Sequence, residues 1–389
     1  VVNKGDRWPR RTTTRFLWDR ERLNLSFGSN RPSSGIAVMM KKRFLRHGPA
    51  VAIGIGAGIA AAVLFCLAAR ATFAAAVLAN LSPLPIMIAT LGYGAFAGAA
   101  AVVSAMLTVA GLLHTQQKFA SLDTDALGGL VFAFSLGLPA FWLSLLSVLS
   151  RPKGSPNWVV TSRVGSFFTR EYVSLERIFS YAASICATIG VVIAVYVSSL
   201  YGGFDVALEK LSAEVTPLIE PRISPNMHLP NGFDAKHLAR VTILAVAPAA
   251  AGSSLVMLML NLWLAGRVAL LSAQLPRPWP DVAGELRLPQ VYLLVFGAAA
   301  LAGPYLGGLP GHIVVIVAVT LGVAFALVGL ATVHYLSRGS RVRVPLLILI
   351  YLGLIVTGLV FLLLLALTGV IETAFSLRDR KDKTASPKL

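Results

Sequence analysis

Almost all of the sequence after His47 consists of apolar runs, with arginine and lysine placed in the gaps between them. Each run holds about 20 residues, the length at which a helix crosses the ~30 Å hydrocarbon core of a bilayer. Only 13% of the residues are charged, about half the share found in soluble proteins. The chain is therefore predicted to be an all-α, polytopic transmembrane helical bundle.

The runs predict about nine spans, with eight as the alternative. The candidate helices cover 49–69, 72–91, 95–113, 126–149, 178–201, 241–263, 290–309, 312–336 and 345–370. We divide the chain into an N-terminal extension (1–40), a transmembrane helical domain (41–375) and a basic polar tail (376–389).

The charged gaps predict the orientation, because cytoplasmic loops carry an excess of Lys and Arg. The basic segments 41–46, 150–177, 264–289 and 338–343 are expected in the cytoplasm, and the acidic loop 202–240 outside. Nine crossings then leave the basic tail outside, against the rule. Either the tail breaks the rule or one segment does not cross. We suspect the second segment, since Asn80–Pro85 interrupts it.

Residues 1–40 are expected to be disordered or to lie upstream of the true start. Met39 and Met40 stand directly before the basic flank of the first apolar run, as a start and its flank would. Residues 1–46 carry 12 Lys or Arg and 3 Asp or Glu. A nucleic-acid-binding arm is the less favoured reading of this charge, and no specific nucleic-acid partner is expected.

Two loops are expected to contain interfacial helices. In the acidic loop, apolar residues recur at spacings of three and four, which indicates an amphipathic helix: Phe204, Leu208, Leu211, Val215 and Leu218. This helix either lies flat on the membrane or caps a cavity. The loop 150–177 has aromatic residues among arginines and is expected to form a second interfacial helix.

One interruption stands out inside the second apolar run, at Asn80-Leu-Ser-Pro-Leu-Pro85. Pro83 and Pro85 remove backbone donors and disturb a helix, and the freed carbonyls must then be buried in protein or line a cavity. Asn80, Ser82, Pro83 and Pro85 are therefore a candidate solute pocket. The alternative is a kink whose carbonyls are satisfied by neighbouring helices.

A second candidate site follows the sixth run, at Asn261-Leu-Trp-Leu-Ala-Gly-Arg267 and Arg277-Pro-Trp-Pro-Asp281. Its candidate residues are Asn261, Trp263, Arg267, Arg277, Trp279 and Asp281. Trp263 and Arg267 suit the cytoplasmic end of a span, and Arg267 or Arg277 is expected to pair with Asp281. The segment is interpreted as a clamp that joins two spans or as a docking site for a partner or an anion.

No pattern of residues indicates catalysis or a cofactor. The assigned spans lack Asp, Glu, Lys and Arg in their centres, and proton pumps and many ion-coupled carriers need such groups. No histidine pair has metal-ligand spacing, and no phosphate-binding loop is present. The glycines at 54, 56 and 58 lie inside an apolar run, where small residues allow close helix packing. We therefore expect no enzyme, no cofactor and no metal.

The stretch from Met40 to about Phe375 resembles the YybS-like family of bacterial integral membrane proteins, in the form found in alphaproteobacteria. The residues that carry the resemblance are Gly54-Ile-Gly-Ala-Gly58, Leu81-Ser-Pro-Leu-Pro85, and the pair Asn261–Arg267 and Arg277–Asp281. The family is a domain of unknown function, so it implies no activity for any residue. The chain is also loosely similar to the membrane-embedded substrate-capture subunits of vitamin transporters.

Two functions are therefore expected for a protein of the bacterial inner membrane with a cytoplasmic N-terminus. The first is a solute-binding or permease-like transport component, with its pocket at Asn80–Pro85. The second is a non-catalytic membrane scaffold or assembly factor that docks a cytoplasmic protein through its basic loops. The expected partners are the lipid bilayer, a small-molecule solute in the first case and a cytoplasmic protein in the second.

Overall fold

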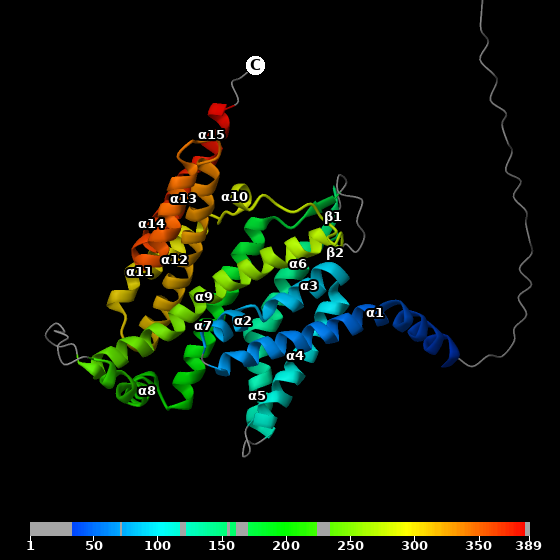
Figure 1. Cartoon of the computed structure of the whole chain (residues 1–389), viewed down its shortest axis with the longest axis horizontal. Coiled ribbons are helices and arrows are strands. Elements are labelled where there is room, and N and C mark those ends of the chain that lie inside the picture. Colours follow the sequence, from blue (N-terminus) through cyan, green and yellow to red (C-terminus); the bar gives the residue numbers. More distant parts are fainter. Residues whose placement is uncertain are drawn as a thin grey trace, which may run out of the picture. The chain divides into compact units, whose positions relative to one another are not determined.

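The computed structural model describes residues 33–70, 72–116, 122–153, 156–160, 170–223 and 234–385. The chain divides into two units, Val1–Arg46 and His47–Leu389, and the helical bundle lies in the second (Figure 1). The predictions that residues 1–32 are disordered, lie upstream of the true start or form a nucleic-acid-binding arm fall outside the described residues.

The described part of the first half contains α1 (Ser33–Cys66), η1 (Leu67–Arg70), α2 (Phe73–Asn80), α3 (Pro83–Tyr93), α4 (Ala95–Gln116), α5 (Leu122–Phe132), the π-helix η2 (Ala133–Gly137), α6 (Leu138–Val148) and α7 (Leu175–Leu200). The second half contains α8 (Phe204–Ile219), η4 (Glu220–Arg222), α9 (Ala235–Leu271), α10 (Val282–Glu285), α11 (Val291–Ala302), η5 (Gly303–Tyr305), α12 (Gly308–Leu336), α13 (Arg343–Val356), α14 (Leu359–Phe375) and α15 (Leu377–Ala385).

Long apolar helices dominate the described residues, and the prediction of an all-α polytopic bundle is confirmed. Among the described residues, seven helices are long and apolar enough to cross a membrane, or eight if the bent pair α14–α15 is counted as one span. The second run is one of the seven, although it is broken into α2 and α3. The suspicion that it fails to cross therefore has no support in the structure.

Close approach of backbones holds neighbouring helices together. Gly54 and Gly58 of α1 lie against Ala97 and Ala101 of α4, and a Cβ atom at either glycine would collide with a carbonyl oxygen there. Because the residue numbers rise together in the two contacts, 54 with 97 and 58 with 101, α1 and α4 run parallel. In the chain, α2 and α3 lead back from the end of α1 to the start of α4. This is the packing use of small residues in membrane helices that the sequence predicts.

The final apolar run does not form one helix, and the prediction of a single span over 345–370 is wrong. It folds as α13 and α14, which turn back at Thr357 and Gly358 and bring Phe361 against Gly353. Gly329 of α12 packs on Leu365 and Gly369, and Gly369 packs on Phe325. Lys381, which follows α14, donates to the carbonyl of Leu336 at the end of α12, so α12 and α14 finish at the same end of the bundle and run parallel. α13 therefore begins at that end and α14 returns to it.

This hairpin resolves the conflict at the basic tail. Lys381 of α15 donates to the carbonyl of Leu336 at the end of α12, at 2.9 Å, and Tyr335 donates to Asp382 at 2.6 Å. The tail helix therefore lies at the same end as the turn 337–342. α15 is a strongly charged helix, bent by 59° from α14, and it covers that end instead of extending the span.

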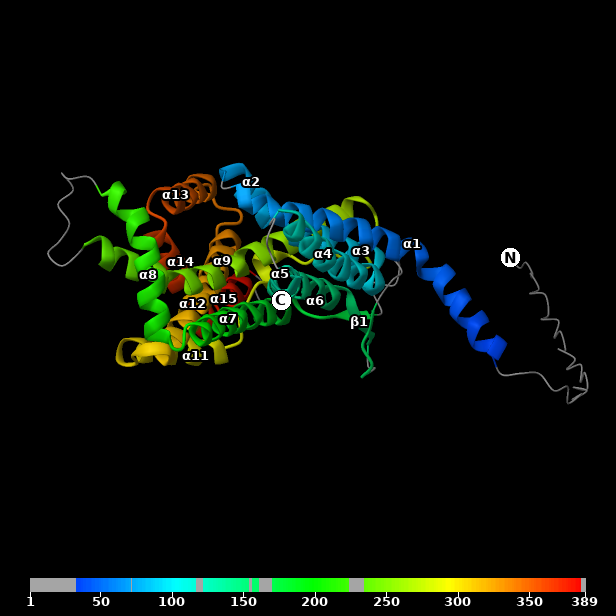
Figure 2. The same ribbon diagram turned by 90° about the horizontal axis from the view of Figure 1, so that it is seen from below.

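The basic loops gather at this end, which we call the basic end. Tyr172 donates to the carbonyl of Pro276 at 2.7 Å, Gly92 approaches Gln274, and Asp281 is bonded to Arg338. α8 lies at the opposite end (Figure 1), the end nearer the viewer when the molecule is seen from below (Figure 2). The described parts of the basic segments 150–177, 264–289 and 338–343, which the positive-inside rule places together, therefore share one end of the fold.

The described part of loop 150–177 forms strands, which corrects the expectation of an interfacial helix. β1 (Leu149–Pro152) pairs antiparallel with β2 (Val159–Val160) and β3 (Arg170–Tyr172), in the order β2-β1-β3. Arg151 also bonds Glu171 across the β1–β3 pair at 2.9 Å. Polar pairs across the two strands, Arg151 with Glu171 and Arg170 with Ser150, are the contacts that stabilise a short antiparallel pair of strands.

Candidate functional site

The interruption at Asn80–Pro85 is a true helix break. α2 ends at Asn80, Ser82 precedes α3, and Pro83 occupies the first turn of α3, where its missing N–H costs no intrahelical bond. The Leu84 N–H bonds the carbonyl of Leu81, so the Asn80 carbonyl is left without its i+4 partner. Sequence reasoning is right about the break and about the freed carbonyl.

The freed carbonyl is taken by a neighbouring helix. Asn261 of α9 donates its Nδ2 to the Asn80 carbonyl at 2.9 Å and to the Met257 carbonyl at 2.8 Å. The Asn80 side chain is exposed and donates to the Ala76 carbonyl. The structure thus joins residues that the sequence assigned to two separate sites, and it fits the alternative of a kink satisfied by a neighbour.

Two polar atoms at this junction have no hydrogen-bond partner within the described residues. They are Ser82 Oγ and Asn261 Oδ1, and both side chains are fully buried. Pro83 is buried beside them and Pro85 is half-buried. Two cavities in the described part of the bundle, one of about 510 Å³ and one of about 460 Å³, are lined by other residues.

Arg277 holds together three elements at the basic end. Its side chain is buried, and its Nη1 donates to the carbonyls of Ser147 on α6 and Val173 before α7, at 3.0 and 3.2 Å. Its guanidinium also stacks over the Tyr172 ring. Burial lowers the pKa of Arg277 and raises that of Tyr172, as expected where the charged form of a group loses water.

Trp279 folds the same loop back onto α9. Its indole lies on Gly266, where a Cβ atom would overlap the ring. Trp263 and Arg267 stay on the exposed side of α9, with the guanidinium 5.8 Å from the centre of the Trp263 ring. The side chains of Arg277 and Trp279 are thus used in contacts within the chain, as a clamp between spans requires.

Asp281 pairs with a residue that sequence reasoning missed, so the expected pairing with Arg267 or Arg277 is wrong. Arg338, after α12, makes two hydrogen bonds to the Asp281 carboxylate at 2.6 and 2.7 Å. These bonds hold the pKa of Asp281 below its ordinary value and raise that of Arg338. The two residues are 57 positions apart in the sequence, so no local pattern predicts their pairing.

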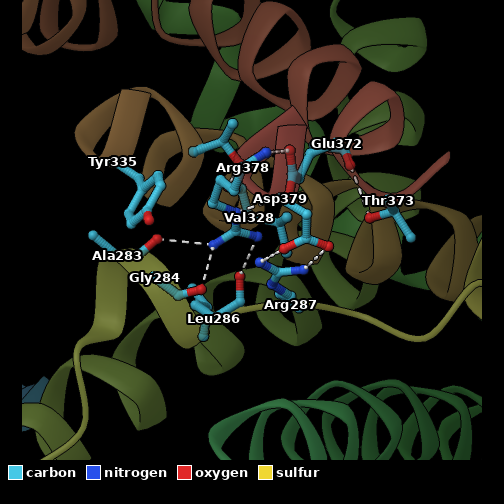
Figure 3. A network of polar contacts seen from close by, with 12 residues as sticks. Ala283, Gly284, Leu286, Arg287, Val328, Tyr335, Glu372, Thr373, Arg378 and Asp379 are labelled. Carbon is cyan, nitrogen blue, oxygen red and sulfur yellow. Dashed lines mark hydrogen bonds and ion pairs between the residues drawn. The ribbon is translucent and has the colours of Figure 1, made fainter. Parts of the chain in front are cut away.

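The most buried charges of the basic end are also outside both predicted sites (Figure 3). Arg378 is 0% exposed and bonds Glu372, which is 3% exposed, at 2.8 Å. Its remaining donors reach the carbonyls of Ala283, Gly284 and Leu286. Next to it, Arg287 makes two hydrogen bonds to Asp379. The network fixes α10 and α15 to the end of α14.

A cavity lies at the other end of the bundle, between α7, α8, α9 and α12. Its volume is about 510 Å³, within the range of small-molecule sites. The wall is mostly apolar and includes Ile193, Val197, Phe204, Leu208, Ile243 and Ala247. α8 covers it with Phe204, Ala207, Leu208 and Leu211, so the amphipathic helix predicted from the sequence caps a cavity.

The cavity is elongated along the helix axes. Its α7 wall runs from Cys186 to Ser198, a rise of about 18 Å at 1.5 Å per residue. Gly190 of α7 packs on Ala251 of α9, and both residues line the cavity. The length is close to half of the ~30 Å hydrocarbon core. The cavity therefore has about the depth of one leaflet.

A few polar groups interrupt the apolar wall. His312 lies at the α8 end, with its ring centre 5.2 Å from that of Phe204. Ser198 is at the same end, and Ser254 lies deeper on α9. Within the described residues, no hydrogen bond is found for the hydroxyls of Ser198 and Ser254, whereas the Ser253 hydroxyl bonds a carbonyl of its own helix. The cavity thus offers unused hydrogen-bonding groups to an occupant.

In the described residues, no group of three His, Cys, Asp or Glu side chains is placed to hold a metal ion.

No protein-family model, curated protein or solved structure matches the chain. The integral membrane character therefore rests on the apolar helices themselves.

Proposed function

We propose that this integral membrane protein is a transport component that binds an elongated, lipid-like solute in the cavity beneath α8. The observation that carries the proposal is the cavity itself, an apolar space about as deep as one leaflet, capped by an amphipathic helix. It replaces the Asn80–Pro85 break as the solute site, because the carbonyl freed at the break is already bonded to Asn261.

The shape and the surroundings of the cavity favour a lipid-like solute. Ile193 and Val246 line the cavity and are 43% and 56% exposed, on helices whose outer surface faces lipid. An apolar chain can therefore reach the cavity without crossing water. The polar groups His312 and Ser198 lie at the α8 end, where the head of an amphipathic molecule would meet the membrane surface.

The scaffold hypothesis has less support. Its proposed docking residues Arg277, Trp279 and Asp281 are engaged in contacts within the chain. Membership of the YybS-like family and residence in the bacterial inner membrane, with the basic end in the cytoplasm, remain predictions from the sequence.

Binding of cis-parinaric acid, a fluorescent long-chain fatty acid, tests the proposed function in protein reconstituted in nanodiscs. The variant Ala247→Trp fills the cavity, and Ala249→Trp places the same ring on an exposed position of α9 that does not line it. We expect Ala247→Trp to weaken binding by about tenfold or more, equivalent to about 1.4 kcal/mol, and Ala249→Trp to leave it unchanged. Equal affinities for the two variants would overturn the proposal.

A further inference from the structure

A second hollow lies on the neighbouring face of α7. It is a groove of about 460 Å³ between α7 and the segment from η2 to α6. Aromatic and aliphatic residues form most of its wall: Phe134, Leu138, Pro139, Phe141, Trp142, Ile185 and Ile189. Phe134 and Trp142 are 64% and 48% exposed. The groove is therefore open to the lipid that surrounds these spans.

The groove and the cavity meet at one residue of α7. Ile189 lines both, and Leu136 of η2 lines the cavity next to the groove residue Leu138. Within η2, Phe134 faces the groove and Ser135 faces the cavity. The wider π turn at this point interrupts the regular α-helix, as such turns often do at functional sites.

The two hollows follow each other along α7. The groove is lined by α7 residues 184–189 and the cavity by residues 186–198, so together they cover 184–198, a rise of about 21 Å at 1.5 Å per residue. Since α7 runs from the basic end towards α8, the groove lies on the basic side of the cavity. A long apolar molecule in the groove would meet the cavity end-on at Ile189.

A short series of polar side chains follows the same line. Ser184 and Thr188 line the groove, and Ser135, Ser254 and Ser198 line the cavity. The Ser135 hydroxyl donates to the carbonyl of Val131 at 2.6 Å. Ser184 already bonds Tyr292, whereas no bond is found for Thr188 within the described residues.

From this continuity we propose that the groove is the lateral entrance through which the apolar chain of the solute passes from the bilayer into the cavity. Ile189 and Leu136 form the partition between entrance and cavity. The proposal rests on the proposed function, since it assigns the route to the same ligand site. The occupant of the groove is the lipid-like solute itself.

The rates of cis-parinaric acid binding to the full chain in nanodiscs test this route. Thr188→Trp obstructs the groove but leaves the cavity intact, and Val192→Trp puts the same ring on an exposed α7 position that lines neither hollow. If the groove is the entrance, Thr188→Trp slows association and dissociation together, each by about tenfold or more, while Kd stays the same. Ile189→Ala widens the partition and speeds both rates.

Other outcomes separate this proposal from the proposed function. If Thr188→Trp behaves like Val192→Trp and Ile189→Ala changes neither rate, the entrance is wrong. If Thr188→Trp alters Kd with association unchanged, the groove is not on the route and the proposal also falls. In both cases the loss of binding in Ala247→Trp still supports the cavity as the binding site.

Discussion

The side-chain amide of Asn261 bonds the backbone carbonyl of Asn80, 181 residues away, at 2.9 Å. This bond supplies the partner that the α2–α3 break removes. Asn80 contributes to this bond through its backbone, whereas Asn261 contributes through its side chain. A substitution at Asn261 is therefore expected to lower the free energy of unfolding more than one at Asn80.

Asn261→Leu should lower the free energy of unfolding by about 1–3 kcal/mol, because it leaves a carbonyl without a partner in an apolar interior. Asn80→Ala removes only an exposed side-chain bond and should change the free energy of unfolding by less than about 0.5 kcal/mol. Thermal unfolding of both variants in detergent checks the contrast. Equal losses would mean that the Asn80 side chain has a role beyond the helix break.

Arg378→Met should destabilise the protein by about 3–5 kcal/mol, because it leaves Glu372 charged and buried. The carbonyls of Ala283, Gly284 and Leu286 lose a donor in the same step. The double variant Arg378→Met with Glu372→Met removes the orphaned charge and should recover part of the loss. A double variant that is less stable than Arg378→Met would contradict this account, and unfolding midpoints provide the measurement.

The Asp281–Arg338 pair should make a small contribution to acid stability. The hydrogen bonds from Arg338 hold the pKa of Asp281 below its ordinary value. A carboxyl whose pKa is lower in the folded protein stabilises it above the unfolded pKa, about 3.9, and loses that contribution as the pH falls through the folded pKa. Both side chains are partly exposed, at 40% and 48%, so the contribution is at most about 1 kcal/mol.

Asp281→Asn should accordingly lower the melting temperature slightly at pH 7. As the pH is lowered, the melting temperature of the variant should fall less than that of the wild type. Melting curves of the wild type and the variant between neutral and acidic pH give the comparison. The same acid slope in both proteins would show that other carboxyls carry the effect.

The hairpin α13–α14 predicts that α15 and the turn after α12 lie on one side of the membrane and α8 on the other. After Cys66 and Cys186 are changed to alanine, single cysteines at Gly339, Lys383 and Asp205 report the sides by labelling with an impermeant maleimide. Gly339→Cys and Lys383→Cys should react from the same side, and Asp205→Cys from the opposite one. Labelling of Lys383→Cys together with Asp205→Cys would falsify the hairpin.

Local patterns were sufficient for several parts of the fold. Runs of apolar residues predict the spans because a bilayer requires every crossing backbone to satisfy its own hydrogen bonds as a helix. The Ser82–Pro83 break and the amphipathic α8 were also readable, since proline chemistry and helical periodicity act over a few residues. The basic gaps correctly grouped the loops that share one end.

The errors concern partners that are distant in sequence. The final run, 345–370, is apolar apart from Thr357 and Thr368. The pair Thr357-Gly358 forms the turn, but the same pair at 368–369 lies inside α14, so the local sequence does not distinguish one 26-residue span from two shorter helices. The packing of Phe361 of α14 on Gly353 of α13 shows the hairpin. Likewise, Asp281 has arginines nearby in the chain, but folding brings Arg338 closer.

By itself, the sequence determined that this chain is an all-α bundle in a membrane with its basic loops at one end. The reason is that the free energy of moving a side chain from water into lipid depends mainly on the residue type. Only the tertiary structure decided which carbonyl Asn261 satisfies, where the last run turns back, and where space remains between α7, α8, α9 and α12. A cavity is the volume that side chains from several helices leave unfilled, and no single segment of sequence encodes it.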